Sequence, residues 1–486
     1  MYGGTLRFAL DCEPNCFDPS GVNTLSDLHV MSTLYDTLLE IDHQLNVQPG
    51  LVESWEILSP ARYKMKLRAG VLFQDGTPLT TAHIRWTFQY YQREDSILRE
   101  TVQLIEEVEV LDEFTFVLKL TRPHAPFLSQ LASTTGMILS SNTVAVENET
   151  GETLHLFVGT GPFVPIKKTA RAFCLQRNPS YWDVNESGQP LPYAQYIELP
   201  WLENGTEMLN ALESGELSFI NEVPYAKVPA LAQREDLQFV GIASHSYNGI
   251  RLQVTTFPFS EKPLRQAVAA SIDREWMLEK VNLGVGYVSH GPIAPASWAF
   301  DEEFRPYKPD RDRIQTLLLA GGCPTGFEFT IKIPPGPIAR MVTCIKEQLA
   351  EQGITMHLEV VEFPELVESL VSQNYQAMFL GFAGGTDPHS LLFETFHSRG
   401  GENYTGYSNP HVDALLEEAC LVTDQAQRIA LYRHAQQIVV EDSPFVFTRS
   451  GLSMIAKRSN IHQIEPHPDT LIRWKKIWIQ EESVSR

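Results

Sequence analysis

Long apolar runs are missing from this sequence. No run reaches the roughly 18 residues that a helix needs to span a bilayer. The first ten residues also lack the cationic and apolar segments of a secretory signal. Strand-like residues begin at Thr5, so we expect either a cytosolic protein or, more in keeping with that early strand, an exported one whose signal has been removed.

Basic residues are scarce relative to acidic ones. The 486 residues include 38 Lys and Arg against 60 Asp and Glu, and the formal net charge is −22. This balance argues against nucleic acid and against anionic membrane surfaces as partners. Maintaining solubility is its simpler explanation. A hydrophobic content of 43% and this length predict a globular protein of about three domains.

Motifs that carry chemistry are also missing. The sequence has no P-loop, no GxGxxG after a strand, no GxSxG and no HExxH. His389 and His397 are eight residues apart, but no carboxylate completes a metal geometry, so we predict no metal site and no cofactor. These absences favour binding over catalysis. A hydrolase stays open as an alternative, because a catalytic triad is assembled in space.

Cysteines are few and scattered, apart from one close pair. Cys12 and Cys16 stand in CEPNC, and the other four resemble small buried apolar residues. The pair is consistent with a local disulfide in an exported protein or with two free thiols. Metal binding is disfavoured, because two thiolates need further ligands and no second CxxC exists.

The most patterned stretch covers residues 55–88. Residues 63–67 alternate apolar and polar side chains as a half-buried strand does, and Asp75-Gly76-Thr77-Pro78 is typical of a turn. Thr80 or Thr81 then precedes a helix with Ile84, Phe88 and Tyr91 on one face. In the second half, a strand (327–333), a helix (338–352) and a strand (355–361) predict a βαβ-like unit, and the whole pattern is mixed α/β.

This stretch resembles the signature of family 5 of the extracytoplasmic solute-binding proteins of ABC importers, the peptide, oligopeptide and nickel-binding class. The matching residues are Leu67-Arg68-Ala69-Gly70-Val71, Phe73, Asp75-Gly76-Thr77-Pro78 and Thr81-Ala82. His83 replaces the family's usual acidic residue. Further matches follow in the family's order: Gly159-Thr160-Gly161-Pro162-Phe163, Arg177-Asn178-Pro179-Ser180-Tyr181-Trp182, Ala211-Leu212-Glu213-Ser214-Gly215-Glu216, Leu264-Arg265-Gln266-Ala267-Val268, Ile272-Asp273-Arg274-Glu275, Gln348-Leu349-Ala350-Glu351-Gln352-Gly353-Ile354 and Tyr407-Ser408-Asn409-Pro410.

The resemblance implies an α/β fold of the type II periplasmic-binding-protein kind (cluster C), with two lobes joined by a hinge and an extra β-rich domain. Domain I would comprise residues 1–36, 166–252 and 451–486. Domain II, the β-rich insertion, would comprise residues 37–165, and domain III residues 253–450. Hinge closure would trap a ligand between lobes I and III. Residues 55–88 would belong to domain II, which usually lies away from the ligand.

The loop after the first strand supplies one group of ligand-binding candidates. In this fold that strand runs to the cleft, so we expect Cys12, Asn15, Cys16 and Phe17 to line the pocket. The competing interpretation is a structural loop clipped by a disulfide.

A second group follows the buried strand 377–382. In peptide-binding members of the family an acidic residue of this loop pairs with the ligand ammonium, a role that Asp387 would take here. Phe382 replaces the usual Trp as an apolar wall, and Gly384 and Gly385 would let the backbone approach a ligand closely. The alternative for Asp387 is a turn residue before proline.

The remaining candidates are an arginine and three loop residues. Arg340 corresponds to an arginine that fixes the ligand carboxylate in dipeptide binders, a role that its planar fork suits. Asn403, Tyr404 and Trp298 would line the cleft. Their alternatives are a surface arginine and ordinary packing.

The resemblance therefore predicts a monomeric, non-enzymatic receptor in the periplasm or another extracytoplasmic space. It would deliver a peptide, or a peptide-like or opine-like solute, to the transmembrane subunits of an ABC permease. The alternatives are a receptor of the same fold for a nickel or other metal chelate, an oligosaccharide receptor, which would need more exposed Trp, and a cytosolic hydrolase.

Overall fold

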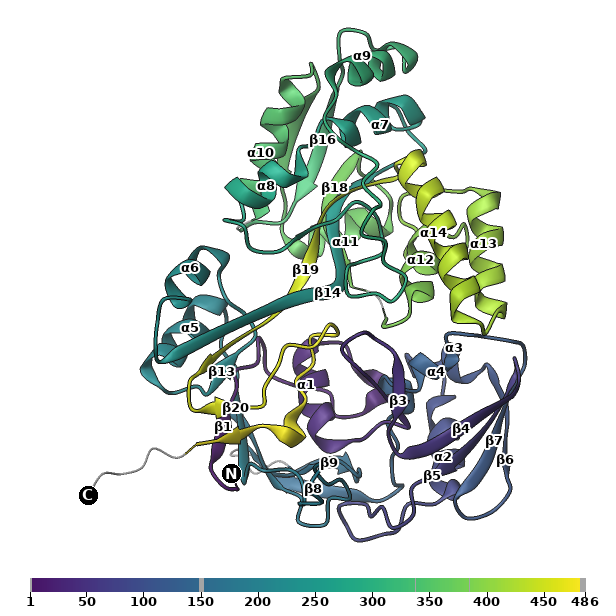
Figure 1. The fold of residues 1–486 in the computed structure, drawn as a ribbon, viewed down its shortest axis with the longest axis vertical. Coiled ribbons are helices and arrows are strands. Elements are labelled where there is room, and N and C mark those ends of the chain that lie inside the picture. The colour runs from purple at the N-terminus through teal and green to yellow at the C-terminus, as the bar shows by residue number, and fades with distance from the viewer. Residues whose placement is uncertain (1, 148–152, 337, 384, 481–486) are drawn as a thin grey trace. The chain divides into compact units, whose positions relative to one another are not determined.

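Two strands carry the chain between two structural units. The structure is a computed structural model that describes residues 2–147, 153–336, 338–383 and 385–480. Unit 1 contains Met1–Ile242 and Ser453–Arg486, and unit 2 contains Ala243–Leu452. Both boundaries therefore fall inside strands, one in β14 (Leu237–Leu252) and the other in β19 (Phe445–Arg458) (Figure 1).

The first sheet of unit 1 contains a parallel pair of strands. Its order is β1 (Thr5–Arg7), β12 (Tyr196–Pro200), β11 (Ala172–Arg177), β10 (Phe163–Lys168). β1 runs parallel to β12, and the other neighbours are antiparallel. Beyond β1, Phe8 forms a parallel bridge with Phe219 in β13 (Phe219–Ile220). The carboxyl ends of β1, β12 and β13 therefore lie on the same side of this sheet.

The second sheet of unit 1 holds the stretch that carries the family signature. Its strands are antiparallel, in the order β4 (Val52–Ser59), β5 (Arg62–Leu67), β7 (Thr115–Leu120), β6 (Ile105–Val110). The predicted strand, turn and helix are confirmed by β5, the turn at Asp75-Gly76 and α2 (Thr81–Tyr91). Thr80 is the N-cap of α2, and its backbone N–H donates to His83 Nδ1 at 3.2 Å. His83 therefore has a capping role where the family usually has an acidic residue.

Two other family motifs meet at one buried carboxylate, Asp36. Thr160 Oγ1, Tyr181 Oη and Trp182 Nε1 donate to it at 3.0, 3.0 and 2.8 Å. Burial raises the pKa of Asp36 to about 6, although the hydrogen bonds from Trp182 and Tyr181 oppose the rise. A Cβ on Gly159 would lie 2.1 Å from the carbonyl oxygen of Leu34, so only glycine fits there. These motifs are therefore structural.

Unit 2 is built on a mixed sheet. Its strand order is β19, β14, β18 (Ala377–Ala383), β16 (Glu328–Ile333), β17 (Thr355–Val360), and β16 is parallel to both β17 and β18. The connecting helices are α10 (Ile338–Ala350) and α11 (Phe363–Val371). The predicted βαβ-like unit is confirmed here.

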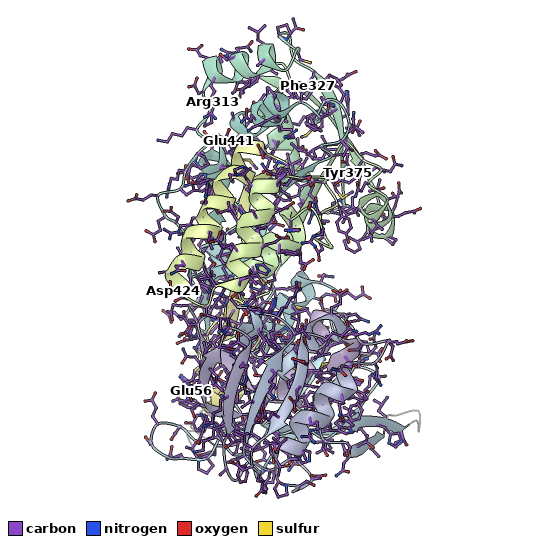
Figure 2. The ribbon with its side chains drawn as sticks, turned by 90° about the vertical axis from the view of Figure 1, so that its right-hand side faces the viewer. Glu56, Arg313, Phe327, Tyr375, Asp424 and Glu441 are labelled. Atoms are coloured by element: carbon purple, nitrogen blue, oxygen red, sulfur yellow. The ribbon has the colours of Figure 1, made fainter. Side chains whose placement is uncertain are left out.

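Six further helices belong to unit 2. They are α7 (Lys262–Ala270), α8 (Arg274–Lys280), α9 (Arg311–Ala320), α12 (Pro388–Phe396), α13 (Pro410–Leu421) and α14 (Gln425–Asp442). α13 and α14 run side by side, and Asp424 and Glu441 mark the two ends of α14 in Figure 2. The remaining elements are short or lie in unit 1: α1 (Leu25–Leu34), β2 (Leu39–Ile41), β3 (Val47–Pro49), α3 (Arg99–Val102), α4 (Phe127–Gln130), β8 (Thr143–Glu147), β9 (Thr153–Phe157), α5 (Gly205–Ser214), α6 (Val228–Leu231), β15 (Tyr287–Val288), β20 (Ile461–His462) and β21 (Trp478–Ile479).

Two helix predictions differ from the structure. The amphipathic pattern of residues 263–281, with Pro263 at its start, predicts one helix, but the chain forms α7 and α8, because Asp273 caps α8 by accepting the N–H of Trp276 at 2.9 Å. The apolar stripe of Met31, Leu34, Tyr35 and Leu38 predicts a helix over 29–39, but α1 ends at Leu34 and starts earlier, since Thr24 accepts the N–H of Asp27 at 3.0 Å as its N-cap. The three-part domain division stays a prediction.

Candidate functional site

The first candidate region lies where β1, β12 and β13 end in unit 1. Leu10 forms a parallel bridge with Trp201, as Phe8 does with Phe219. In the parallel pairing of Phe8 with Phe219, the positions three residues further along the two segments are Asp11 and Glu222. The carboxyl ends of parallel strands at one sheet edge are where ligands of open α/β folds bind.

The predicted loop after β1 is held by the first turn of α1. Asp27 Oδ1 accepts the N–H groups of Asn15 and Cys16 at 2.9 and 3.1 Å. Ser26 Oγ donates to Asp11 and accepts from the N–H of Cys12 at 3.3 Å. The loop is therefore fixed by hydrogen bonds rather than by a crosslink, since both of its cysteines are free thiols.

The four predicted residues of this loop have different surroundings. Cys12 and Asn15 are exposed, whereas Cys16 and Phe17 are half-buried. The Phe17 ring stacks on Phe173 with 5.1 Å between centroids, as a core residue does. Burial raises the pKa of the Cys16 thiol. Of the four predicted residues, Cys12 and Asn15 are thus the two whose side chains are open to solvent.

Sequence reasoning missed a polar group at the same strand ends. His29 is buried against Phe8, and its Nε2 lies 3.4 Å from Asn221 Nδ2. Burial lowers the pKa of His29 to about 4, and the charge of Asp11 partly offsets this. Burial and then Asp11 raise the pKa of Glu222. In the residues that the structure describes, neither Asp11 nor Glu222 has an ion-pair partner, so a cationic group is the complementary ligand chemistry.

In unit 2, two predicted residues come together around an arginine that the sequence did not single out. Arg428 Nη2 donates to Asp387 Oδ1 at 2.7 Å, and both side chains are buried. The guanidinium lies 5.2 Å from the Trp298 ring centroid and 5.3 Å from that of Tyr432. Asp387 also accepts the N–H of His389 at 2.9 Å as N-cap of α12. This carboxylate is engaged by internal partners, so its predicted role toward a ligand ammonium stays a prediction.

The neighbouring loop positions are only partly described. Phe382 is buried and stacks on Tyr247 with 6.1 Å between centroids. Gly385 is exposed, and a Cβ there would lie 2.8 Å from Ser390 Oγ. Gly384 lies outside the described residues. Phe382 is thus a core residue of unit 2, and the glycine prediction rests on Gly385.

Asn403 organises its own loop. Its amide donates to the carbonyls of His397 and Tyr407 at 3.0 and 2.7 Å, and its Oδ1 accepts the N–H of Tyr407 at 3.2 Å. The carbonyl of Tyr404 accepts the Tyr375 hydroxyl at 2.7 Å. Both predicted residues are half-buried, and the hydrogen bonds of Asn403 give it a structural role whether or not a ligand reaches it.

Arg340 is exposed to solvent in unit 2. It lies on the first turn of α10, and its side chain is exposed. Burial raises the pKa of the Cys344 thiol, one turn further along the same helix, and the charge of Arg340 partly opposes that rise. Its position leaves both the surface and the carboxylate-binding interpretations open.

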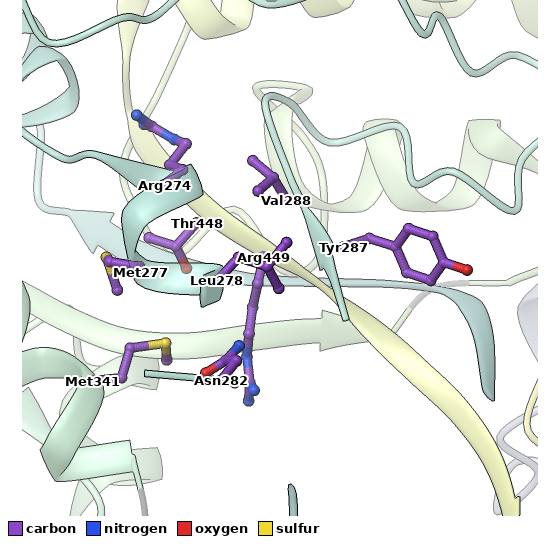
Figure 3. Close-up of a pocket in the computed structure, with 9 residues that line it drawn as sticks. All are labelled: Arg274, Met277, Leu278, Asn282, Tyr287, Val288, Met341, Thr448 and Arg449. Carbon is purple, nitrogen blue, oxygen red and sulfur yellow. The ribbon is translucent and has the colours of Figure 1, made fainter. Parts of the chain in front are cut away.

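A small pocket of unit 2 contains none of the predicted residues (Figure 3). Its lining residues are Arg274, Met277, Leu278, Asn282, Tyr287, Val288, Met341, Thr448 and Arg449. Its empty volume is about 220 Å³ even when space open to solvent is counted, below the roughly 300 Å³ at which small-molecule sites begin. The buried Arg274 donates from Nε to the carbonyl of Phe447 at 2.7 Å. We interpret this pocket as a packing feature.

The described residues contain neither a candidate membrane span nor a candidate metal cluster. No helix among them combines the length and apolarity of a membrane span. They also contain no cluster of three or more His, Cys, Asp or Glu side chains arranged to hold a metal ion.

Comparison with known proteins relates the whole chain to solute receptors. The oligopeptide-binding protein AppA of Bacillus subtilis (strain 168) is 26% identical over 507 aligned residues, which cover 98% of this chain and 92% of AppA. Among solved structures, the periplasmic binding protein DppA of Helicobacter pylori, in complex with the peptide STSA, superposes with a TM-score of 0.81 at 22% identity, covering 99% of each chain. AgaA of A. tumefaciens R10, in complex with agropinic acid, superposes with a TM-score of 0.76 at 21% identity, again covering 99% of each chain.

These likenesses confirm the predicted fold, that of the type II periplasmic binding proteins. The family model for the middle region of the bacterial extracellular solute-binding proteins, family 5, matches residues 46–404, which is more than half of the chain. The chain therefore belongs to the bacterial extracellular solute-binding proteins, family 5.

Proposed function

We propose that this protein is the non-enzymatic, monomeric receptor of an ABC importer, and that it captures a small peptide or a peptide-like or opine-like solute outside the cytoplasmic membrane. The observation that carries this proposal is the family match across residues 46–404. AppA, DppA and AgaA add support, because the first is named as oligopeptide-binding and the other two were solved with a peptide and an opine.

The described side chains support a solute with charged ends. In unit 1, Asp11 and Glu222 are carboxylates at the ends of parallel strands without ion-pair partners in the described part of the chain. In unit 2, Arg340 is an exposed guanidinium whose fork fits a carboxylate. A peptide or an opine has both a cationic group and a carboxylate, whereas a neutral oligosaccharide has neither.

Thermal unfolding against a panel of solutes tests the proposal. A ligand that binds the folded chain raises Tm, and a concentration of 100 times Kd stabilises it by about 2.7 kcal/mol. The protein is first unfolded, dialysed and refolded to remove any solute that copurifies. We expect di- to pentapeptides or opines to raise Tm, while neutral oligosaccharides leave it unchanged.

The same panel distinguishes the alternatives. A Tm rise with nickel–histidine only, together with nickel in the purified protein, would identify a chelate receptor. Recovery of the bound peptide and its mass spectrum test for hydrolysis, because a receptor returns the peptide intact. No shift with any peptide or opine would overturn the proposal.

A further inference from the structure

A row of large apolar side chains lies on the surface of unit 2. Val360 ends β17, and Phe363, Val367 and Val371 follow on α11. Their exposed fractions are 57%, 59%, 39% and 61%. The spacing of four residues places the three helical side chains on one face of α11. We call these four residues the α11 patch.

The α11 patch is not required to cover the core beneath the helix. Leu366 and Leu370 already face that core, where they pack with Val361, Tyr375 and Met378. The apolar arc of α11 is therefore wider than the surface it buries inside unit 2. Contiguous exposed apolar side chains of this kind mark interaction surfaces more often than scattered ones do.

The strand next to α11 is also at an edge. Among the described strands β17 pairs with β16 alone, so it ends the sheet of unit 2. Glu359 and Val360 are exposed at the end of this strand. The exposed edge of β17 therefore continues the surface formed by α11. Natural proteins usually protect such edge strands from pairing with other chains.

The charge around the patch is predominantly negative. Residues 347–398 contain eight carboxylates and neither Lys nor Arg. Glu359, Glu362, Glu365 and Glu368 are the carboxylates nearest in sequence to the patch, and all four are exposed or half-buried. The ammonium of Lys332 does reach this region, 2.9 Å from Ser369 Oγ and 3.8 Å from Glu359. A surface of this composition is complementary to apolar side chains flanked by Lys or Arg.

We propose that the α11 patch and its surrounding glutamates dock on an apolar, positively charged surface of the ABC permease. This inference rests on the proposed function, because a receptor that delivers its solute must contact the transmembrane subunits. Two other occupants fit less well. An anionic bilayer surface would be repelled by the glutamates, and a second copy would bring two equally acidic surfaces together.

The test measures binding of the full chain to its cognate permease in lipid nanodiscs, with and without solute. The apolar variant is Phe363→Ser/Val371→Ser, and the charge variant is Glu365→Lys/Glu368→Lys. Leu421→Ser is the control, since Leu421 is an exposed apolar residue of unit 2 outside the patch, on α13. All of these side chains are exposed, so the variants are expected to fold, which circular dichroism and Tm verify.

We expect the apolar variant to weaken permease binding at least about tenfold. The charge variant should lower the association rate, most strongly at low salt. Solute affinity should stay within about twofold in every variant, and Leu421→Ser should match the wild type. Solute affinity is thus measured separately from permease binding. Permease binding without solute can be measured before any solute is identified.

Four results would overturn the proposal while leaving solute capture intact. The first is equal permease binding by all variants. The second is binding of solute but of no permease disc. The third is equal, patch-dependent binding to empty nanodiscs, which would identify a lipid contact. The last is a wild-type dimer in sedimentation that Phe363→Ser/Val371→Ser converts to a monomer.

Discussion

The guanidinium of Arg428 donates to the carboxylate of Asp387 at 2.7 Å while both side chains are buried. Asp387 follows β18 and caps α12, and Arg428 lies in the first turn of α14. The rings of Trp298 and Tyr432 lie on the guanidinium. The pair therefore ties two helices of unit 2 together, and its geometry needs no ligand.

We predict that Asp387→Ala destabilises the protein by about 3–5 kcal/mol, because it leaves a buried guanidinium without its counter-ion. Urea unfolding measures this loss. Asp387→Leu/Arg428→Met removes both charges and should recover most of the stability. If Asp387→Asn instead keeps the wild-type stability but loses affinity for peptides with a free ammonium, the carboxylate acts on the ligand.

His29 should make unit 1 sensitive to acid. Burial lowers the pKa of its imidazole to about 4 in the folded chain, against an ordinary value of 6.5. The folded state thus disfavours the proton that the unfolded state binds, so stability is complete above pH 6.5 and falls as the pH drops to 4. The full difference is about 3 kcal/mol.

Urea unfolding of wild type and His29→Phe between pH 7 and 4 tests this prediction. We expect the variant to lose stability less steeply over that range, since phenylalanine keeps the packing on Phe8 and has no proton to gain. His411→Phe is the control, because His411 is exposed on α13. Parallel curves for wild type and His29→Phe would contradict the pKa assignment.

Periodicity predicted the regular elements of unit 2 well and their boundaries less well. The alternation of strands and helices between residues 327 and 382 is predicted correctly, because the helices and the strands β16 and β17 are amphipathic and β18 is a short continuous apolar run. Residues 263–281 have a continuous apolar face, yet Asp273 accepts the Trp276 N–H and starts a new helix. A local capping bond outweighed the longer pattern there.

The family motifs identified the fold without identifying the site. Thr160, Tyr181 and Trp182 bond to Asp36, and Tyr407 and Asn409 bond to Asp442 at 2.7 and 2.8 Å. These side chains fix loops that the fold requires, so they reveal its class. Their hydrogen bonds are internal, so they do not indicate which solute the protein binds.

Site predictions depended on partners that a sequence does not pair. Asp387 and Arg428 are 41 residues apart, and Asp11 and Glu222 come from distant strands. The sequence offered a turn role for Asp387 before proline, but only the structure shows that it caps α12 and pairs with Arg428. The sequence did not single out Glu222, because the residues next to it are typical of any strand end.

Asn403 should matter for stability rather than for affinity. Asn403→Ala removes hydrogen bonds to the backbone of His397 and Tyr407, which we expect to cost about 2 kcal/mol. Asn374→Ala, at an exposed asparagine of the same unit, should cost less than about 0.5 kcal/mol. Asn403→Ala with wild-type stability and reduced solute affinity would reverse this interpretation.

The coupling of Asp11 to Glu222 can be measured without a ligand. The negative charge of Asp11 helps to raise the pKa of Glu222. We therefore predict that Asp11→Asn lowers the pKa of Glu222, as followed by NMR of its side-chain carboxyl carbon. Glu186→Gln, at an exposed turn of the same unit, should leave that pKa unchanged. An unaltered titration of Glu222 in Asp11→Asn would show that the two carboxylates do not interact.

Arg340 offers the clearest separation of surface and ligand roles among the predicted residues. Because its side chain is exposed on α10, Arg340→Gln should change the free energy of unfolding by less than about 0.5 kcal/mol. If the guanidinium holds a carboxylate in two places, the same variant should bind peptides with a free C-terminus about tenfold or more weakly, since charge-assisted bonds of this kind are strong. Peptides with an amidated C-terminus should bind wild type and variant alike. Calorimetry with matched acid and amide peptides measures both, and Lys346→Gln on the same helix controls for the loss of one positive charge. Equal losses for acid and amide peptides would mean that Arg340 does not bind the carboxylate.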